Sequence, residues 1–233
     1  TLDGIDVDVV FKDIKNVHLS VHPPTGRVRL SAPKDARPEV VRAFAVSKLS
    51  WIRRHQRVLR EQEREPQREY VDRESHYVWG RRYLLEVKEA DARPHVEIDH
   101  HHLTLSVRPG TGHADRGAVL ARWHRDQIRE IAPAMIARWE PILGVKLERF
   151  VVRRMRTLWG SCTAATRIIR LNTELAKKPQ DCLEYIIVHE LAHLIEPTHN
   201  ARFIEIMDSV MPVWRARRDR LNDLPVRHEE WGY

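Results

Sequence analysis

Two histidines four residues apart, with a glutamate directly after the first, are the residues of this chain best suited to chemistry. His189, Glu190 and His193 occupy the segment His-Glu-Leu-Ala-His. On a helix of 3.6 residues per turn, positions four apart lie on one face, so both imidazoles can bind a single cation. Glu190 then projects beside the pair, where its carboxylate can take a proton from a water that the metal activates. The spacing predicts a metal-dependent hydrolytic site with Glu190 as general base.

The surroundings of this motif argue against a chance match on a surface helix. Apolar residues flank it almost all round, which predicts a buried helix. Three adjacent ionisable groups in a buried helix need partners, and a metal ion supplies one. Core histidines satisfied by hydrogen bonds are the alternative. The flanking apolar residues are Leu183, Ile186, Ile187, Val188, Leu191, Leu194 and Ile195.

A third protein ligand must come from outside the motif, because a catalytic zinc ion has three protein ligands and one open position. His199 follows His189 by ten residues, beyond a proline that should end the helix and turn the chain back. His199 is therefore the best candidate, while Glu196, Glu205 and His228 stay open as rivals. Glu205 is the strongest rival, because some zinc enzymes take a glutamate ligand from the next helix. Nitrogen ligands around an open position favour Zn²⁺, which lowers the pKa of a bound water to about 7.

The composition predicts a soluble globular protein of the cytoplasm. Of 233 residues, 42% are hydrophobic and 31% charged, which excludes fibrous and low-complexity classes. Two cysteines, Cys162 and Cys182, cannot build a disulfide framework, so we expect a reducing compartment. The first residues carry no secretory signal pattern. No stretch approaches the roughly 18 uncharged apolar residues of a membrane span, so no membrane association is expected.

The net charge of +7 fits an anionic partner, either nucleic acid or a phosphate-bearing substrate. Dispersed surface charge is the commoner explanation of such a balance. The densest basic cluster is the segment 215–220, which we interpret as a solvated helix face rather than a nucleic-acid footprint. Weak binding of nucleic acid through the basic surface stays an alternative.

The hydropathy pattern predicts an α+β fold with a β-rich domain over residues 1–110 and a catalytic domain over 111–233. In the first part we expect three short strands in a meander, a helix over 38–64 and further strands. A turn-rich stretch, 109–115, precedes a change to helical periodicity. The expected strands lie at 7–11, 17–21, 27–30, 77–87, near Val96 and Leu103, and at 150–152 and 168–171. The expected later helices cover 115–140, which Pro133 kinks or breaks, 181–195, and 201–221, which Pro212 kinks or breaks.

Motif-like segments extend over nearly the whole chain. The strongest are 154–162 (RMRTLWGSC), 169–175 (IRLNTEL) and the His-Glu-Leu-Ala-His segment with His199 and Phe203; weaker ones are 48–52 and 79–84. Together they resemble the YgjP-like metallopeptidase family, a relative of the WLM and SprT-type zinc proteases. The resemblance implies a small zincin-like α/β core behind the β-rich part. It also implies a zinc ion held by His189, His193 and His199, with Glu190 as the catalytic carboxylate.

The resemblance leaves the substrate open between three classes. A metallopeptidase would cleave a peptide or an unfolded protein. Some relatives are described as UTP pyrophosphatases, in which arginines would bind the phosphates of a nucleoside triphosphate and Mg²⁺ or Mn²⁺ could replace zinc. A third interpretation is a DNA-associated protease like the SprT relatives, whose DNA binding would weaken steeply with salt. The candidate substrate-binding residues are Arg154, Arg156, Trp159, Ser161 and Asn172.

Several of these residues also have a purely structural interpretation. Trp159 and Cys162 can be core residues, and Asn172 can fix a turn. The run of histidines at 100–102 is predicted to be a hairpin tip rather than a metal site. Consecutive residues of a strand point to opposite faces, so the three side chains cannot easily converge on one ion.

Overall fold

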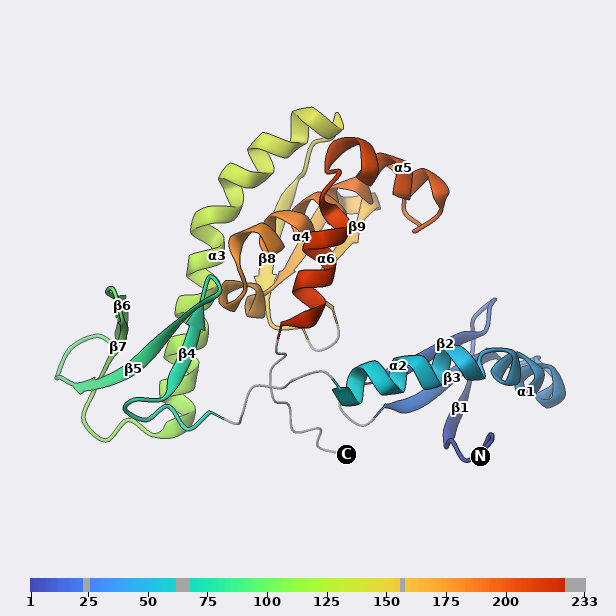
Figure 1. Cartoon of the computed structure of the whole chain (residues 1–233), viewed down its shortest axis with the longest axis horizontal. Coiled ribbons are helices and arrows are strands. Elements are labelled where there is room, and N and C mark those ends of the chain that lie inside the picture. The colour runs from blue at the N-terminus through green and yellow to red at the C-terminus, as the bar shows by residue number, and fades with distance from the viewer. Residues whose placement is uncertain (23–25, 62–67, 156–157, 225–233) are drawn as a thin grey trace. The chain divides into compact units, whose positions relative to one another are not determined.

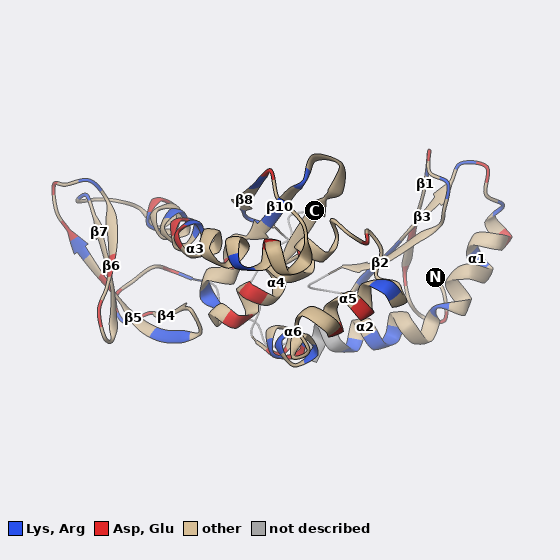
Figure 2. Ribbon diagram, turned by 90° about the horizontal axis from the view of Figure 1, so that it is seen from above, with Lys and Arg blue, Asp and Glu red and all other residues tan. Residues whose placement is uncertain are grey.

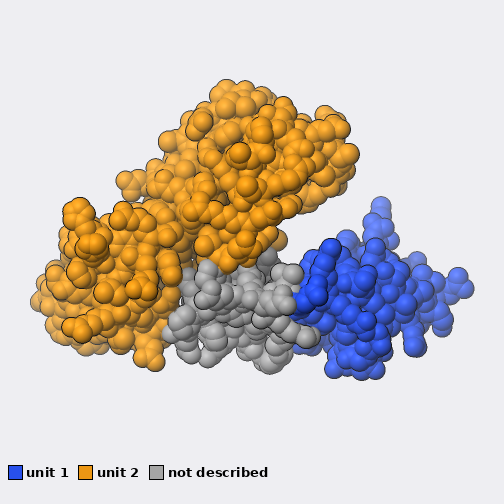
Figure 3. All heavy atoms as spheres, viewed as in Figure 1, with its two compact units in different colours: residues 1–65, 225–233 blue, residues 66–224 orange. Residues whose placement is uncertain are grey.

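The computed structural model describes residues 1–22, 26–61, 68–155 and 158–224, with the backbone alone for 58–61. The fold is of the α+β class (Figure 1). The chain forms two compact units, residues 1–65 with 225–233 and residues 66–224 (Figure 3). Within the described ranges, no helix is both long and apolar enough to cross a membrane.

The first unit contains a three-stranded sheet in the order β1-β3-β2. The central strand β3 runs parallel to β1 and antiparallel to β2, so the predicted meander is wrong. β3 takes the central place because Val28, Leu30 and Ala32 are fully buried, whereas no residue of β1 or β2 is. The strands are β1 (Val7–Lys12), β2 (His18–His22) and β3 (Arg27–Pro33).

The single helix predicted over 38–64 is wrong, because two helices occupy this segment. They are α1 (Pro38–Ser47) and α2 (Leu49–Glu61). The chain turns at Lys48, whose N–H donates to the carbonyl of Ala45, three residues back, at 3.1 Å. Neither proline nor glycine marks this turn, so the hydropathy pattern runs through it unchanged.

The second unit begins with a four-stranded sheet in the order β4-β5-β7-β6. The strand predicted over 77–87 is a hairpin, because Trp79 and Gly80 both have positive φ angles, 50° and 78°, and form its two-residue turn. The histidines at 100–102 lie where β6 turns into β7, as predicted for a hairpin tip. The strands are β4 (Ser75–Val78), β5 (Arg81–Glu89), β6 (His95–Ile98) and β7 (His102–Val107).

Helix α3 (His113–Leu143) connects this sheet to the core that follows it. Leu120 packs against the sheet, whereas Ile128 and Ala132 pack into the larger core beyond it. The helix runs through Pro133 without a break. Buried residues on both sides of the proline pack into the same core. The compact units therefore differ from the predicted division between residues 110 and 111, which stays a prediction.

The larger core consists of a three-stranded sheet, β8-β10-β9, with helix α4 packed against it. Strand β10 is central, parallel to β8 and antiparallel to β9, and its Ile169 and Leu171 are fully buried. Pro212 lies between the last two helices, so the predicted break is confirmed. The elements are β8 (Arg149–Arg153), β9 (Gly160–Thr163), β10 (Ile168–Asn172), η2 (Thr173–Lys177), α4 (Gln180–Ala192), α5 (Ala201–Val210) and α6 (Trp214–Asp223).

The turn between β4 and β5 docks onto the end of η2 and onto Pro179, the segment that leads into α4. The N–H of Trp79 donates to the carbonyl of Ala176 at 2.8 Å, and that of Gly80 donates to Lys177 at 3.1 Å. A Cβ atom added to Gly80 would lie 2.7 Å from Cγ of Pro179, which precedes α4. The four-stranded sheet therefore supports the N-terminal end of the helix that carries the histidine motif.

Gly80→Ala is expected to lower the free energy of unfolding by about 2–4 kcal/mol. An L-residue in the left-handed region costs about 1–2 kcal/mol, and the contact with Pro179 adds to this cost. Gly110→Ala is the matched control, because Gly110 has a φ of 75° but no atom within 4 Å of its added Cβ. Urea unfolding of both variants measures the difference. Equal losses in the two variants would show that the turn does not press on Pro179.

The basic residues of helix α6 lie among acidic ones (Figure 2), and their ion pairs favour the interpretation as a solvated helix face. Four arginines of this helix pair with acidic side chains of the same unit. The pairs are Arg215 with Asp208, Arg217 with Glu184, Arg218 with Asp219 and Arg220 with Asp181. Paired guanidinium groups are poorly disposed to bind phosphates, so this helix gives no support to nucleic-acid binding.

Candidate metal centre and active site

Helix α4 presents His189 and Glu190 and ends at Ala192, three residues earlier than predicted. His193 is its C-cap residue and keeps helical angles, with φ −67° and ψ −13°. The imidazoles of His189 and His193 therefore still lie together, with ring centroids 4.9 Å apart. The helix is held rigidly from behind, because Val188 and Leu191 are fully buried in the core.

The chain then turns back and brings His199 to the same place. The turn is built by Glu196, whose Oε1 accepts hydrogen bonds from the N–H and the hydroxyl of Thr198 at 3.2 and 2.8 Å. The Asn200 side chain caps α5 by accepting from the N–H of Phe203 at 3.0 Å. As a result, the ring of His199 lies 4.9 Å from that of His189 and 4.6 Å from that of His193.

The three imidazoles fit a divalent metal ion. Each offers a ring nitrogen within 4.8 Å of the others, and Nε2 of His189 lies 2.9 Å from Nε2 of His199. Two nitrogens bound to one zinc ion lie at most about 4.2 Å apart, twice the Zn–N bond length, so side-chain shifts of about half an ångström would bring the three nitrogens to one ion. Nδ1 of His193 must donate to the carbonyl of Glu196 at 3.0 Å, since a carbonyl only accepts. This bond leaves Nε2 of His193 with a lone pair for the ion.

Phe203 forms the floor beneath all three imidazoles. Its ring centroid lies 5.0, 4.6 and 4.8 Å from those of His189, His193 and His199, and it stacks on His193. The side chain is only 2% exposed. A buried ring in contact with each imidazole limits the rotamers that the histidines can adopt. Phe203 therefore helps to hold the three imidazoles in their positions relative to one another.

The electrostatic surroundings favour neutral histidines, the form that binds metals. Burial lowers the pKa of His189 to about 3, and the nearby His193 and His199 add to the shift. Burial and His193 also lower the pKa of His199. Nδ1 of His189 is buried and has no hydrogen-bond partner among the described residues.

Glu190 is the buried acid of the site. It is 4% exposed, and burial raises the pKa of its carboxyl to about 8. On the sheet side it faces Gly160, the first residue of β9. A carboxyl group in so dry a place, one residue after His189, has a proton affinity typical of a general base rather than of a surface charge.

The rivals for the third ligand position lie elsewhere. The Glu196 carboxylate is bonded to Thr198, and these hydrogen bonds lower its pKa. Glu205 is an exposed residue of α5. Neither belongs to the group of side chains that converge with His189. His228 lies outside the described residues.

The candidate substrate-binding residues that the structure describes lie on or near strands β8, β9 and β10. Trp159 is half-buried against the core, with Nζ of Lys178 5.8 Å from its ring centroid. Ser161 is a half-buried residue of β9, and Arg154 is exposed just after β8. Arg156 lies outside the described residues. Substrate contacts of these side chains stay predictions.

Asn172 has the structural role that was the alternative for this residue. Its Nδ2 donates to the carbonyls of Met155 and Leu158 at 2.9 and 2.8 Å. Its Oδ1 accepts from the N–H of Glu174 at 3.2 Å. The side chain thus holds the segment that leads into β9, and it is 5% exposed.

Cys162 is packed as a small apolar residue. It is half-buried on β9 against the core. Burial, reinforced by the charge of Glu190, raises the pKa of its thiol to about 11. A thiol that stays protonated at neutral pH is a poor nucleophile, so these surroundings favour the structural interpretation of Cys162.

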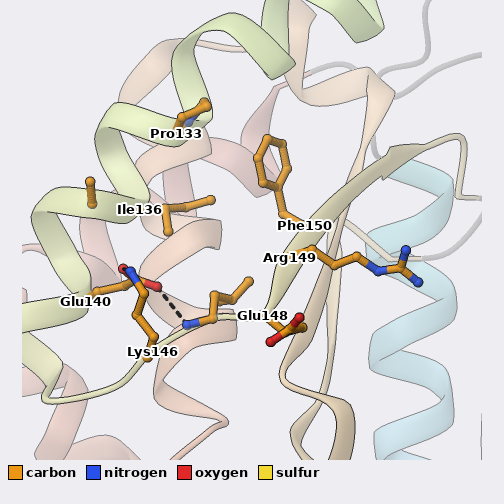
Figure 4. A pocket seen from close by; sticks show the side chains of 9 residues that line it. Pro133, Ile136, Glu140, Lys146, Glu148, Arg149 and Phe150 are labelled. Carbon is orange, nitrogen blue, oxygen red and sulfur yellow. Dashed lines mark hydrogen bonds and ion pairs between the residues drawn. The ribbon is translucent and has the colours of Figure 1, made fainter.

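A separate pocket lies between α3 and β8 and contains none of the three histidines (Figure 4). Its buried polar residue is Glu140, whose carboxylate accepts hydrogen bonds from Nζ of Lys146 and the N–H of Leu147, both at 2.7 Å. Burial opposes ionisation of this carboxyl, but the two bonds outweigh it and lower the pKa. The carboxylate is therefore already satisfied within the protein.

Hydropathy and spacing overlooked two residues of this site. Gly160 was visible only as part of the Trp-Gly-Ser-Cys segment, and Phe203 only through the family resemblance. Neither residue type carries chemistry of its own, so no pattern of reactive groups could have marked it. Their importance appears only from what they touch.

Comparison with known proteins places the chain in a family. Residues 15–224 match the family described as YgjP-like, metallopeptidase domain. No curated protein matches the chain. Among solved structures, the metallopeptidase zymogen of Pyrococcus abyssi abylysin matches with 22% sequence identity and a TM-score of 0.37, over 39% of this chain and 91% of that one. Because the family match spans most of its length, the chain belongs to the YgjP-like metallopeptidase domain family and is of the metallohydrolase type.

Proposed function

We propose that this protein is a zinc-dependent metallopeptidase that cleaves peptide bonds of unfolded proteins. His189, His193 and His199 hold the zinc ion, and Glu190 is the general base. The observation that carries the proposal is the convergence of three imidazole nitrogens within 4.8 Å beside a buried carboxylate. Three nitrogen ligands leave one position open, as a catalytic rather than a structural zinc site requires.

The protein's own groups divide the work of hydrolysis between them. When bound, the ion acts as a Lewis acid that acidifies water and polarises a carbonyl oxygen. Glu190 accepts a proton from the attacking water and can return it to the leaving amine. The buried position of Glu190 keeps other water away from the carboxylate, so its proton exchange is confined to the reacting groups.

A peptide substrate is favoured by the position of β9. This strand pairs with β10 on one side only and forms the edge of its sheet within the part of the chain that is described. Its first residue, Gly160, lies against Glu190. An edge strand offers unpaired N–H and C=O groups to an extended peptide, which would place a peptide bond next to the carboxylate.

Removal of the metal tests the proposal directly. The purified protein should contain about one zinc ion per chain, as expected for a catalytic site. A chelator should abolish cleavage of fluorescently quenched casein, and added Zn²⁺ should restore it. UTP serves as a parallel substrate, and release of pyrophosphate without casein cleavage would refute a peptidase. Retention of full casein cleavage after complete removal of metal would refute the metal-dependent mechanism.

A further inference from the structure

We propose that Gly160 is a positioning residue for the general base: its bare backbone, at the start of β9, is the wall against which the side chain of Glu190 rests. This inference rests on the proposed role of Glu190. Gly160 offers no side chain to the substrate, and an added Cβ atom would meet Glu190 rather than the open edge of the strand, so we expect a substitution here to act on the reaction through the carboxylate.

The space beside the Cα atom of Gly160 is already filled by side chains of α4. A Cβ atom added there would lie 2.5 Å from Oε1 and 2.9 Å from Cγ of Glu190. It would also lie 2.8 Å from Cγ2 of Ile186. Cβ atoms in proteins essentially never come within 3.0 Å of another heavy atom. Any side chain at position 160 must therefore displace Glu190, Ile186 or the strand itself.

The strand is anchored on its other side, so it cannot easily withdraw. Gly160 is paired with Leu171 of β10, which is fully buried. The N–H of Asn172 donates to the carbonyl of Trp159 at 2.9 Å. The Asn172 side chain also holds the carbonyl of Leu158, which comes just before this pair. A methyl group at position 160 should therefore displace the side chains of Glu190 and Ile186 rather than move β9.

Packing is what fixes the carboxylate of Glu190. Among the described residues, no hydrogen bond or ion pair is found for it, and burial accounts for its altered acidity. A general base must lie within about 2.6–3.2 Å of the proton that it takes. With no polar anchor, that precision depends on the contacts with Gly160 and Ile186. A misplacement of about 1 Å can cost about 10²-fold in rate.

Glycine is needed at position 160 for space and not for backbone freedom. Gly160 is not among the glycines with positive φ angles, so alanine could adopt its backbone conformation. Gly112 is the matched control, with an ordinary φ of −72° and no atom within 4 Å of an added Cβ. The methyl group of an alanine would contact Glu190 and Ile186 at position 160 but no other residue within 4 Å at position 112.

The first test compares the activity of Gly160→Ala with that of Gly112→Ala, using quenched casein as the substrate. Gly160→Ala should lower kcat by about 10²-fold, as a displaced base would. Its KM and its Zn²⁺ affinity, measured by competition with a chelator, should stay within about twofold of wild type, because the atoms nearest to the added methyl group belong to Glu190 and Ile186 and not to a histidine. Gly112→Ala should keep the wild-type kcat. A folded, zinc-loaded Gly160→Ala with unchanged kcat would overturn the proposal.

The second test is a double-mutant cycle on the melting temperature of the metal-free protein. Gly160→Ala should lower the Tm, and this loss should shrink by at least half in a Glu190→Ala background, where the methyl group enters the space that the carboxylate left. Ile186 accounts for the remaining loss. If the single variant Gly160→Ala does not fold, a double variant with Glu190→Ala that does fold would support the contact. A double variant that also fails to fold would contradict it. Additive losses would refute the contact.

The cycle needs neither metal nor substrate, so its result is independent of the proposed function. A wild-type chain that binds no zinc and cleaves no protein would refute the proposed function. Coupling in the cycle would then still establish that Gly160 supports the Glu190 side chain. If the wild-type protein cleaves casein but the cycle shows no coupling, the proposed peptidase function stands and the positioning role of Gly160 is refuted.

Discussion

Glu190→Gln is expected to lower kcat for casein by about 10³-fold while the protein keeps its zinc. The amide has nearly the shape of the carboxylate, so the packing against Gly160 is preserved. It cannot accept the proton of the attacking water, and general-base catalysis contributes typically 10²–10⁴-fold. Zinc content is measured alongside the rate, because loss of metal would also abolish activity. A zinc-loaded variant with near wild-type kcat would remove Glu190 from the reaction.

In the absence of metal, Glu190→Gln should make the protein more stable, although it lowers the activity. The pKa of Glu190 in the folded protein, about 8, lies above its ordinary value of 4.5. The neutral acid is thus the favoured buried form, and the wild-type protein loses stability as the pH rises from about 4.5 toward 8. Glutamine does not ionise and avoids this loss.

Each pKa unit corresponds to about 1.4 kcal/mol of stability. The free energy of unfolding of metal-free Glu190→Gln should therefore exceed that of the wild-type protein by a few kcal/mol at pH 8 and by little at pH 4.5. Thermal unfolding of both metal-free proteins at the two pH values measures the difference. Glu205→Gln is the control, since this exposed carboxylate should leave the stability unchanged at both pH values. Wild-type and Glu190→Gln proteins of equal stability at pH 8 would mean that the carboxylate is hydrated.

The motif helix could be predicted because its determinants are local. Apolar residues on every side indicated burial, and the four-residue spacing of His189 and His193 fixed their common face. This prediction survives the early end of α4, since His193 keeps helical angles at the C-cap. Local patterns also revealed strands β8 and β10, whose apolar residues form the core of their sheet.

What could not be predicted depends on contacts between distant residues. The order β1-β3-β2 goes with the full burial of Val28, Leu30 and Ala32 on β3, which a pattern of short alternating strands does not reveal. The turn at Trp79 places a bulky residue at a φ of 50°, against the usual preference, because the turn docks onto Ala176 and Lys177. The support of Glu190 by Gly160 joins residues of different elements and leaves no trace in periodicity.

The sequence also could not decide between His199 and Glu205 as the third ligand, because the decision depends on how the chain turns after α4. A pair of substitutions tests this choice. Sequence spacing allowed both, whereas in the structure the turn at Glu196 and Thr198 brings only His199 among the other two imidazoles. His199→Ala should therefore lower Zn²⁺ affinity by more than the 10–100-fold that loss of an outer-shell partner costs, and casein cleavage with it.

Glu205→Ala is the matched control, since this exposed residue of the neighbouring helix should leave both quantities at the wild-type level. Zn²⁺ affinity is measured by competition with a chelator, and casein cleavage is followed at saturating zinc. A rate that excess Zn²⁺ restores in His199→Ala would mean that two histidines suffice for catalysis. The reverse pattern, with zinc lost from Glu205→Ala and retained by His199→Ala, would require α5 to rotate its outer face toward the motif. It would contradict the packing of Phe203 beneath the three imidazoles, because that contact fixes which face of α5 the histidines meet.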